Sequence, residues 1–190
     1  MGFGTLFIGY FLLFNIPYFG MTDVIAATVM MAGLYKLSTV NRSFKIGYFV
    51  SLVFTVFSIP ELVIFALDLF KITEGSDLLS YLRVGQCVIV CALTVLILRG
   101  IAEVTREVDL PVISKRSRRL IYVTFAVYLL WIACNAPFIS ALFGEYVPYV
   151  YLVAILALFI LVFCNLVTIY GCYMRICMPG EENGRKGKIK

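Results

Sequence analysis

The sequence contains no histidine among its 190 residues. That absence excludes histidine-based catalytic triads, zinc and haem sites that use imidazole ligands, and imidazole proton relays. The chain also lacks a glycine-rich phosphate loop and shows no nucleophile–base pair or paired acids. We therefore expect no metal, no cofactor and no catalytic residues, and the sequence favours a protein that is not an enzyme.

Polar surface is scarce as well. Only 14% of the residues are charged while 62% are hydrophobic, and the mean hydropathy is +0.99, so the chain cannot cover a water-soluble globule. Its apolar runs continue for ~17 to 25 residues and do not alternate over ~10 residues as barrel strands do. These features predict an all-α, polytopic membrane helix bundle surrounded by the lipid bilayer, and they give no support to nucleic-acid binding.

The apolar runs divide the chain into about six transmembrane helices. We expect residues 1–178 to form one transmembrane domain and residues 179–190 to form a disordered, basic cytoplasmic tail. The six predicted segments are Phe3 to Phe19, Val24 to Leu37, Ile46 to Phe70, Leu78 to Ala102, Leu120 to Phe138, and Val147 to Ile176.

Basic residues fall almost entirely on one side of this arrangement, and only Lys71 and Arg83 fall on the other. The positive-inside rule then places both termini in the cytoplasm, and we expect a multi-pass protein of a bacterial cytoplasmic membrane. Pro111 is predicted to end an extension of the fourth helix. The basic cluster after it is interpreted as a topology anchor that also contacts anionic lipid; it consists of Lys115, Arg116, Arg118 and Arg119.

A proline and a carboxylate, Pro60 and Glu61, interrupt the middle of the third apolar run. Proline removes a backbone donor and is expected to bend the helix there. A central acid costs about 2.5 to 3.5 kcal/mol to insert, so Glu61 should face the bundle interior, a wet cavity or a partner, or be protonated. Two interpretations stay open: Glu61 is a cation, amine or proton site, or it is a neutral, hydrogen-bonded packing element.

Counting along the helices suggests which groups share a depth in the membrane. Arg83 matches Asp68, which predicts a structural ion pair, and Glu61 is placed level with residues 88–91, where no base occurs. The candidate ligand-binding residues around Glu61 are Trp131, Asn135, Tyr18 and Gln86. Asn165 in the last helix is predicted to make a helix–helix hydrogen bond.

These residues favour a membrane protein that binds or transports a small solute through an outward-facing site around Glu61. In size and topology alone, six helices with both ends inside resemble the substrate-binding subunits of energy-coupling-factor vitamin transporters, which would imply small-molecule binding. The alternative is a non-catalytic accessory or assembly subunit of a membrane complex. In that hypothesis Thr28, Ala32 and Gly33 let the backbone of a membrane protein partner approach closely.

Overall fold

The fold is described from a computed structural model of the chain. The structure describes residues 2–15, 20–69, 77–135 and 146–177. Side chains are not described at residues 14, 15, 20–22, 61, 65–69, 77–83, 135 and 177. The predicted tail, residues 179–190, lies outside the described residues.

Every element in the described ranges is helical, as predicted. In chain order the elements are α1 (Gly2–Asn15), α2 (Gly20–Leu37), α3 (Arg42–Leu69), α4 (Asp77–Glu107), α5 (Pro111–Asn135), α7 (Val147–Cys172) and the π-helical turn η2 (Tyr173–Cys177). A helix therefore occurs at each of the six predicted segments, and α3 continues through Pro60.

Four stretches are long and apolar enough to cross a membrane: Arg42–Ile64, Val84–Glu107, Pro111–Cys134 and Val147–Ile176. In α1 the apolar segment is the shorter Gly2–Leu13. At 1.5 Å per residue, 14 helical residues cover about 21 Å of a hydrocarbon core about 30 Å thick. The structure thus supports the membrane helix bundle and does not confirm a count of six crossings.

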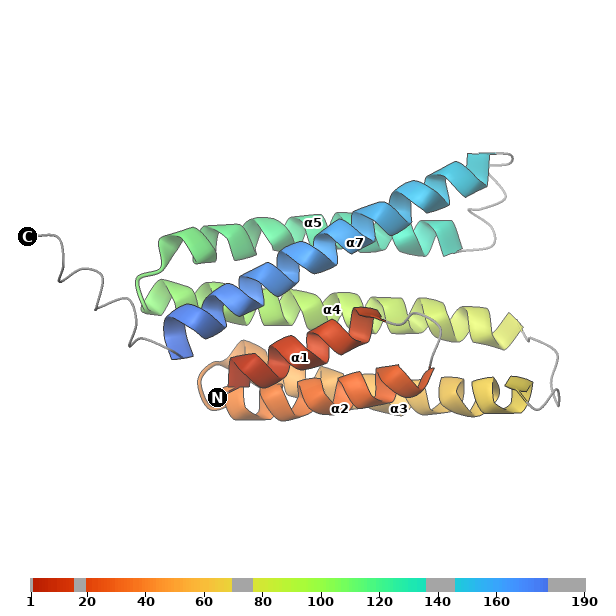
Figure 1. The fold of residues 1–190 in the computed structure, drawn as a ribbon, viewed down its shortest axis with the longest axis horizontal. Helices are drawn as coiled ribbons and strands as arrows, with labels where there is room; N and C mark the ends of the chain where they lie inside the picture. The colour runs from red at the N-terminus through yellow and green to blue at the C-terminus, as the bar shows by residue number, and fades with distance from the viewer. Residues whose placement is uncertain (1, 16–19, 70–76, 136–145, 178–190) are drawn as a thin grey trace, which may run out of the picture.

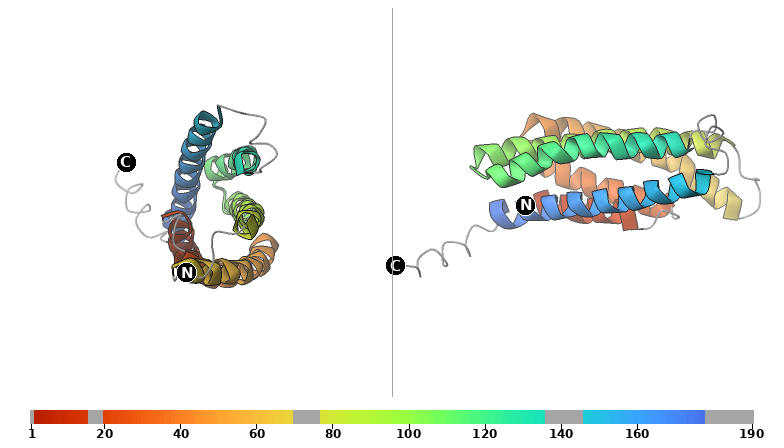
Figure 2. Two further views of the ribbon diagram at one scale, coloured as in Figure 1. Left: turned by 90° about the vertical axis from the view of Figure 1, so that its right-hand side faces the viewer. Right: turned by 90° about the horizontal axis from the view of Figure 1, so that it is seen from above.

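The helices form a ring in which each one packs against its neighbours in sequence (Figures 1 and 2). The first and last helices close this ring, since α1 also packs on α7 and η2. Near this closure the rings of Phe7 and Tyr170 lie 5.7 Å apart. The start of α1, the α2–α3 turn, the α4–α5 turn and the end of α7 all lie at one end of the bundle (Figure 1), which we call the basic end.

The lysines and arginines whose side chains are described all lie toward the basic end, in agreement with the predicted asymmetry of charge, and Arg83 lies near the other end of α4. Those toward the basic end are Lys36, Arg42, Lys45, Arg99, Arg106, Lys115, Arg116, Arg118, Arg119 and Arg175. Which side of a membrane this end faces is not confirmed, so the cytoplasmic placement of both termini stays a prediction.

Two glycines bring the backbones of α1 and α2 together. A Cβ at Gly33 would lie 2.7 Å from the backbone nitrogen of Leu6, and one at Gly9 would lie 2.6 Å from that of Met30. Real Cβ atoms do not come so close to a backbone, so only glycine permits this approach. The sequence suggested that Gly33 contacts a partner protein, but in the structure it contacts α1 of the same chain.

The turn between α4 and α5 corrects the prediction for Pro111. This proline begins α5 and does not end α4, which stops at Glu107. Proline suits the first helical position because the nitrogen there needs no hydrogen bond and its φ is already helical. Asp109 makes the turn with a φ of 60°. The fifth helix therefore begins nine residues before the predicted Leu120 and includes the whole basic cluster.

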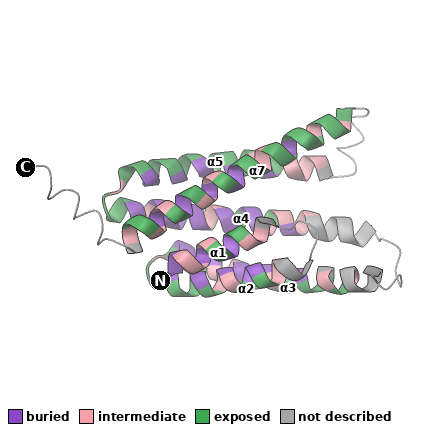
Figure 3. Cartoon of the chain, viewed as in Figure 1, coloured by how far each residue is buried: buried purple, intermediate pink, exposed green. Residues whose placement is uncertain are grey.

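Much of the apolar surface faces outward, as a lipid-exposed bundle requires. Among the described residues of α7 before Leu161, Ala154 alone is buried, and most side chains around it are exposed (Figure 3). Leu152, Phe159 and Phe163 are each more than half exposed. The second half of α7 instead packs on the rest of the ring, so α7 joins the bundle mainly near the basic end.

Candidate functional site

Two of the predicted ligand-binding side chains can be placed. Gln86 on α4 is buried, and the ring of Trp131 on α5 lies 5.2 Å from that of Tyr151 on α7. Tyr18 lies outside the described residues, and the side chains of Glu61 and Asn135 are not described. Glu61 as a ligand therefore stays a prediction.

Two contacts fix the antiparallel register of α3 and α4. A Cβ at Gly100 would lie 2.7 Å from the ring of Phe44, and a Cβ at Gly85 would lie 3.9 Å from the ring of Phe57. Position 57 is therefore opposite position 85, and positions further along α3 lie opposite earlier positions of α4.

This register changes the predicted depth of Glu61. Extending these two contacts along both helices places position 61 opposite residues 81–83, several residues from the predicted level at residues 88–91. The predicted ends of the two helices, Phe70 and Leu78, are within one residue of the observed ends, so the difference comes from the assumption that both helices end at one depth. On the backbone, Arg83 is within about 3 Å of the level of Glu61, whereas Asp68 is seven residues further along α3.

A buried polar cluster that the sequence did not predict as a site lies where four helices meet. Asn165 Nδ2 on α7 donates a 2.9 Å hydrogen bond to Tyr10 Oη on α1. That hydroxyl is 3.4 Å from Thr94 Oγ1 on α4. Tyr128 on α5 is near enough to Tyr10, Cys87 and Cys91 to interact with them electrostatically, and its hydroxyl is near that of Thr94. All four polar side chains are at most 3% exposed. We call Tyr10, Thr94, Tyr128 and Asn165 the tyrosine cluster.

Two atoms of the tyrosine cluster have unused hydrogen-bonding capacity. Within the described part of the chain, Asn165 Oδ1 is fully buried and has no hydrogen-bond partner. Tyr128 Oη is also fully buried and forms no hydrogen bond of good geometry, but the Thr94 hydroxyl is close enough to interact with it. An unpaired buried polar group costs about 1–3 kcal/mol. The predicted helix–helix hydrogen bond of Asn165 is confirmed, and its Oδ1 has no partner among the described residues.

The buried face of α5 continues this polarity toward the basic end. Ser117 and Thr124 are fully buried there, and their hydroxyl oxygens have no partner among the described residues. Ser114, on the same face, donates a 2.9 Å hydrogen bond to the carbonyl oxygen of Ala102 on α4. Sequence reasoning missed this row because the basic cluster hid the helical spacing of the serines.

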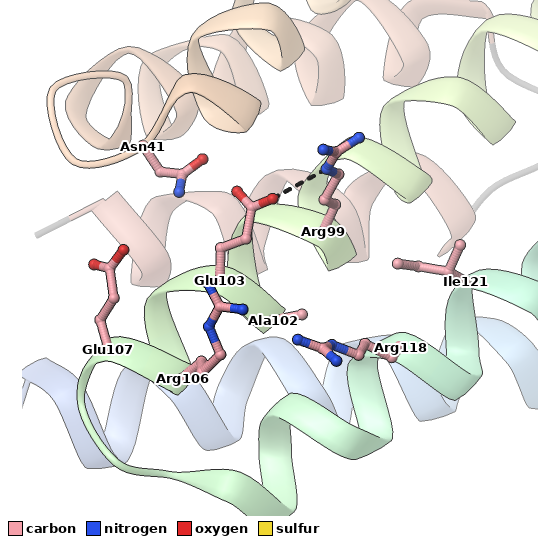
Figure 4. A pocket seen from close by; sticks show the side chains of 8 residues that line it. All are labelled: Asn41, Arg99, Ala102, Glu103, Arg106, Glu107, Arg118 and Ile121. Atoms are coloured by element: carbon pink, nitrogen blue, oxygen red, sulfur yellow. Dashed lines mark hydrogen bonds and ion pairs between the residues drawn. The ribbon is translucent and has the colours of Figure 1, made fainter.

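A pocket of about 360 Å³ lies at the basic end between α4, α5 and the α2–α3 turn (Figure 4). Its polar lining is Asn41, Arg99, Glu103, Arg106, Glu107 and Arg118, and Ala102 and Ile121 complete it. We call it the arginine pocket.

Glu103 is the organised acid of this pocket. Its Oε1 accepts a 3.0 Å hydrogen bond from Arg99 Nε, which is also an ion pair. Its Oε2 accepts a 3.1 Å hydrogen bond from Ser43 Oγ. Ser43 is fixed in turn because its backbone N–H donates to Asn41 Oδ1 at 2.7 Å, which caps the start of α3. Glu103 therefore links α4 to α3 and neutralises Arg99.

The predicted anionic-lipid cluster is divided between two faces of α5. Arg118 lines the arginine pocket. Lys115, Arg116 and Arg119 line a separate hollow of about 460 Å³. Helical spacing explains the division, because residues 115, 116 and 119 share a face and residue 118 is turned away from it.

No group of three or more cysteine, aspartate or glutamate side chains in the described structure could hold a metal ion. The tyrosine cluster offers hydrogen-bond donors and acceptors, and the arginine pocket offers charge.

None of the comparisons with known proteins assigns this chain to a class of protein. No protein-family model matches the chain, and neither a curated protein nor a solved structure matches it. Four helices long and apolar enough to span a bilayer, with large outward-facing apolar surfaces, indicate an integral membrane protein.

Proposed function

We propose that this chain is a multi-pass membrane protein that binds a small polar solute inside its ring of helices, for transport or delivery. The observation that carries this proposal is the tyrosine cluster. It places the unpaired Asn165 Oδ1 and the hydroxyl of Tyr128, which has only the Thr94 hydroxyl near it, in an apolar interior where four helices converge. A bound solute with both a donor and an acceptor would satisfy them.

We include Glu61 in the proposed binding site because of its position on α3. The buried residues Phe44, Gly47, Ser51, Phe54 and Ser58 recur every three or four positions, and position 61 continues this series. With Gln86 buried on the neighbouring helix, the outer half of the ring offers polar groups at two depths. A solute entering from the outer end would meet Glu61 first and the tyrosine cluster second.

The register also bears on the partner of Arg83. The predicted pair of Asp68 with Arg83 stays a prediction, because neither side chain is described. The backbone levels favour Glu61 as the nearer acid. A Glu61–Arg83 pair would reduce the cost of both charges in the bilayer, and it would present a cation and an anion to a zwitterionic solute.

Native mass spectrometry of the gently extracted protein tests the proposal. The samples are the unmodified chain, Glu61→Gln and Tyr128→Phe. The matched control is Tyr122→Phe, because Tyr122 is on the same helix and 77% exposed. We expect a small bound mass on the unmodified chain and on Tyr122→Phe, and less of it on the other two variants. All four should show the same melting temperature within a few degrees.

Two results would contradict solute binding. One is the absence of bound small mass from the unmodified protein. The other is equal retention by Tyr128→Phe and Tyr122→Phe, which would assign the unused atoms of the tyrosine cluster to an ordered water molecule.

An accessory subunit is the second candidate, and the exposure of α2 favours it. Thr28 and Ala32 remain exposed on the outer face of α2, beside Ile25, which is 56% exposed. Small residues on an outer face let a second helix approach closely. A protein chain that co-purifies with the unmodified chain and is lost from Ala32→Leu would support this candidate, and unchanged recovery with Ala32→Leu would reject it.

A further inference from the structure

We infer that the arginine pocket is a binding site for a phosphate group, held between Arg106 of α4 and Arg118 of α5. This inference does not depend on the proposed solute site, which lies elsewhere in the ring. Phosphate is carried both by anionic lipid headgroups and by free phosphate compounds, and the experiment below separates these sources.

Of the three arginines that line the pocket, Arg99 has an ion-pair partner among the described side chains, and Arg106 and Arg118 do not. Arg99 is paired with Glu103, whose two oxygens are both occupied. Among the described side chains no carboxylate forms an ion pair with Arg106 or Arg118. In Figure 4 their two guanidinium groups extend toward the same space beside Ala102. Two like charges directed into one pocket repel each other unless an anion lies between them.

The geometry suits phosphate better than a single carboxylate. A guanidinium group presents five N–H donors in a planar fork, and phosphate has enough oxygens to bond two such forks from different helices. A volume of about 360 Å³ leaves room for a headgroup attached to the phosphate. The pocket also lies at the basic end, near the level where the headgroups of a surrounding bilayer would be.

Glu107 is the opposing charge on the rim. It lines the same pocket, and in Figure 4 its carboxylate points away from Arg106 and Arg118. Its negative charge weakens anion binding from a distance. Removing that charge should therefore strengthen binding, an effect opposite to that of removing either arginine.

The experiment uses the full chain in a neutral detergent. Retention of phosphatidylglycerol over phosphatidylcholine is measured by native mass spectrometry, and binding of inorganic phosphate is measured by calorimetry at a fixed salt concentration. The variants are Arg106→Gln, Arg118→Gln and Glu107→Gln. The matched control is Arg119→Gln, which removes the adjacent charge from the other face of α5.

We expect Arg106→Gln and Arg118→Gln each to weaken binding about tenfold or more, as loss of a charged hydrogen bond does. Glu107→Gln should bind more tightly, and Arg119→Gln should bind like the unmodified chain. Selective retention of phosphatidylglycerol without phosphate binding assigns the site to a lipid headgroup, and phosphate binding assigns it to a free phosphate compound. Equal losses from Arg118→Gln and Arg119→Gln, or no binding of either probe, would overturn the inference.

Discussion

Asn165 donates a hydrogen bond to the hydroxyl of Tyr10 across 155 residues of sequence, at a distance of 2.9 Å. This bond connects the last long helix to the first and lies at the closure of the ring. Both side chains are 1% exposed, so water cannot replace the bond without opening the bundle.

The coupling between these two residues can be measured directly. We expect Tyr10→Phe and Asn165→Leu each to destabilise the protein, and the double variant to cost less than the sum. Interhelical hydrogen bonds in membrane proteins contribute about 0.6 kcal/mol on average and up to about 1.7 kcal/mol. Equilibrium unfolding of the four proteins in mixed micelles gives the coupling energy, and strictly additive effects would show that the bond contributes nothing.

Gly33 and Gly171 should respond differently to substitution by alanine, because of the two only Gly33 lies in the close contact between α1 and α2. Gly33→Ala should destabilise by about 1–3 kcal/mol, because its Cβ would meet the backbone nitrogen of Leu6 at 2.7 Å. Gly171→Ala should be neutral or stabilising, since its nearest neighbour is Ile113 Cδ1 at 3.8 Å and alanine favours helix. Thermal melts of both variants provide the measurement. Similar melting temperatures would contradict the α1–α2 contact.

The start of α3 depends on a side-chain cap. Asn41→Ala should cost about 1 kcal/mol because the N–H of Ser43 loses its acceptor. Asn41→Ser keeps an acceptor at this position and should recover most of the loss. Denaturation midpoints compare the two variants, and equal midpoints would show that Asn41 does not act as a cap.

Exchanging the charges at positions 61 and 83 tests whether Glu61 and Arg83 lie at the same depth in the bundle. If Arg83 pairs with Glu61, Glu61→Arg and Arg83→Glu should each lower the folded yield, and combining them should restore it. The comparison is Asp68→Arg combined with Arg83→Glu. Folded yield after size-exclusion chromatography is the readout. Rescue in the Asp68 combination alone would support the Asp68–Arg83 pair and contradict the register of α3 and α4 described above.

Composition and apolar run length predicted the helical membrane class well, because bilayer thickness imposes a length on each segment. The basic end was also predictable, since charge is excluded from the hydrocarbon core. Pro111 was misassigned because a proline both ends and begins helices, and the choice depended on the Asp109 turn. The six consecutive polar residues before Leu120, residues 114–119, then concealed a helix whose buried face carries Ser114 and Ser117.

The tyrosine cluster could not be predicted, for a different reason. Tyr10, Thr94 and Tyr128 look individually like ordinary residues of apolar helices, and their meeting depends on the closure of the ring. Asn165 gave the one available signal, since an amide within an apolar run needs a partner. The sequence did not indicate that this partner would be a tyrosine on the first helix.

The shortness of α1 has a consequence for how a solute could reach the tyrosine cluster. Its 14 residues cover about two thirds of the hydrocarbon core, and the first half of α7 beyond it is exposed on nearly all sides. Acyl chains of the leaflet opposite the basic end would occupy that flank. The flank therefore offers a second route beside entry from the end of the ring, since a polar solute with enough apolar surface to partition into the membrane could approach the cluster sideways through the lipid.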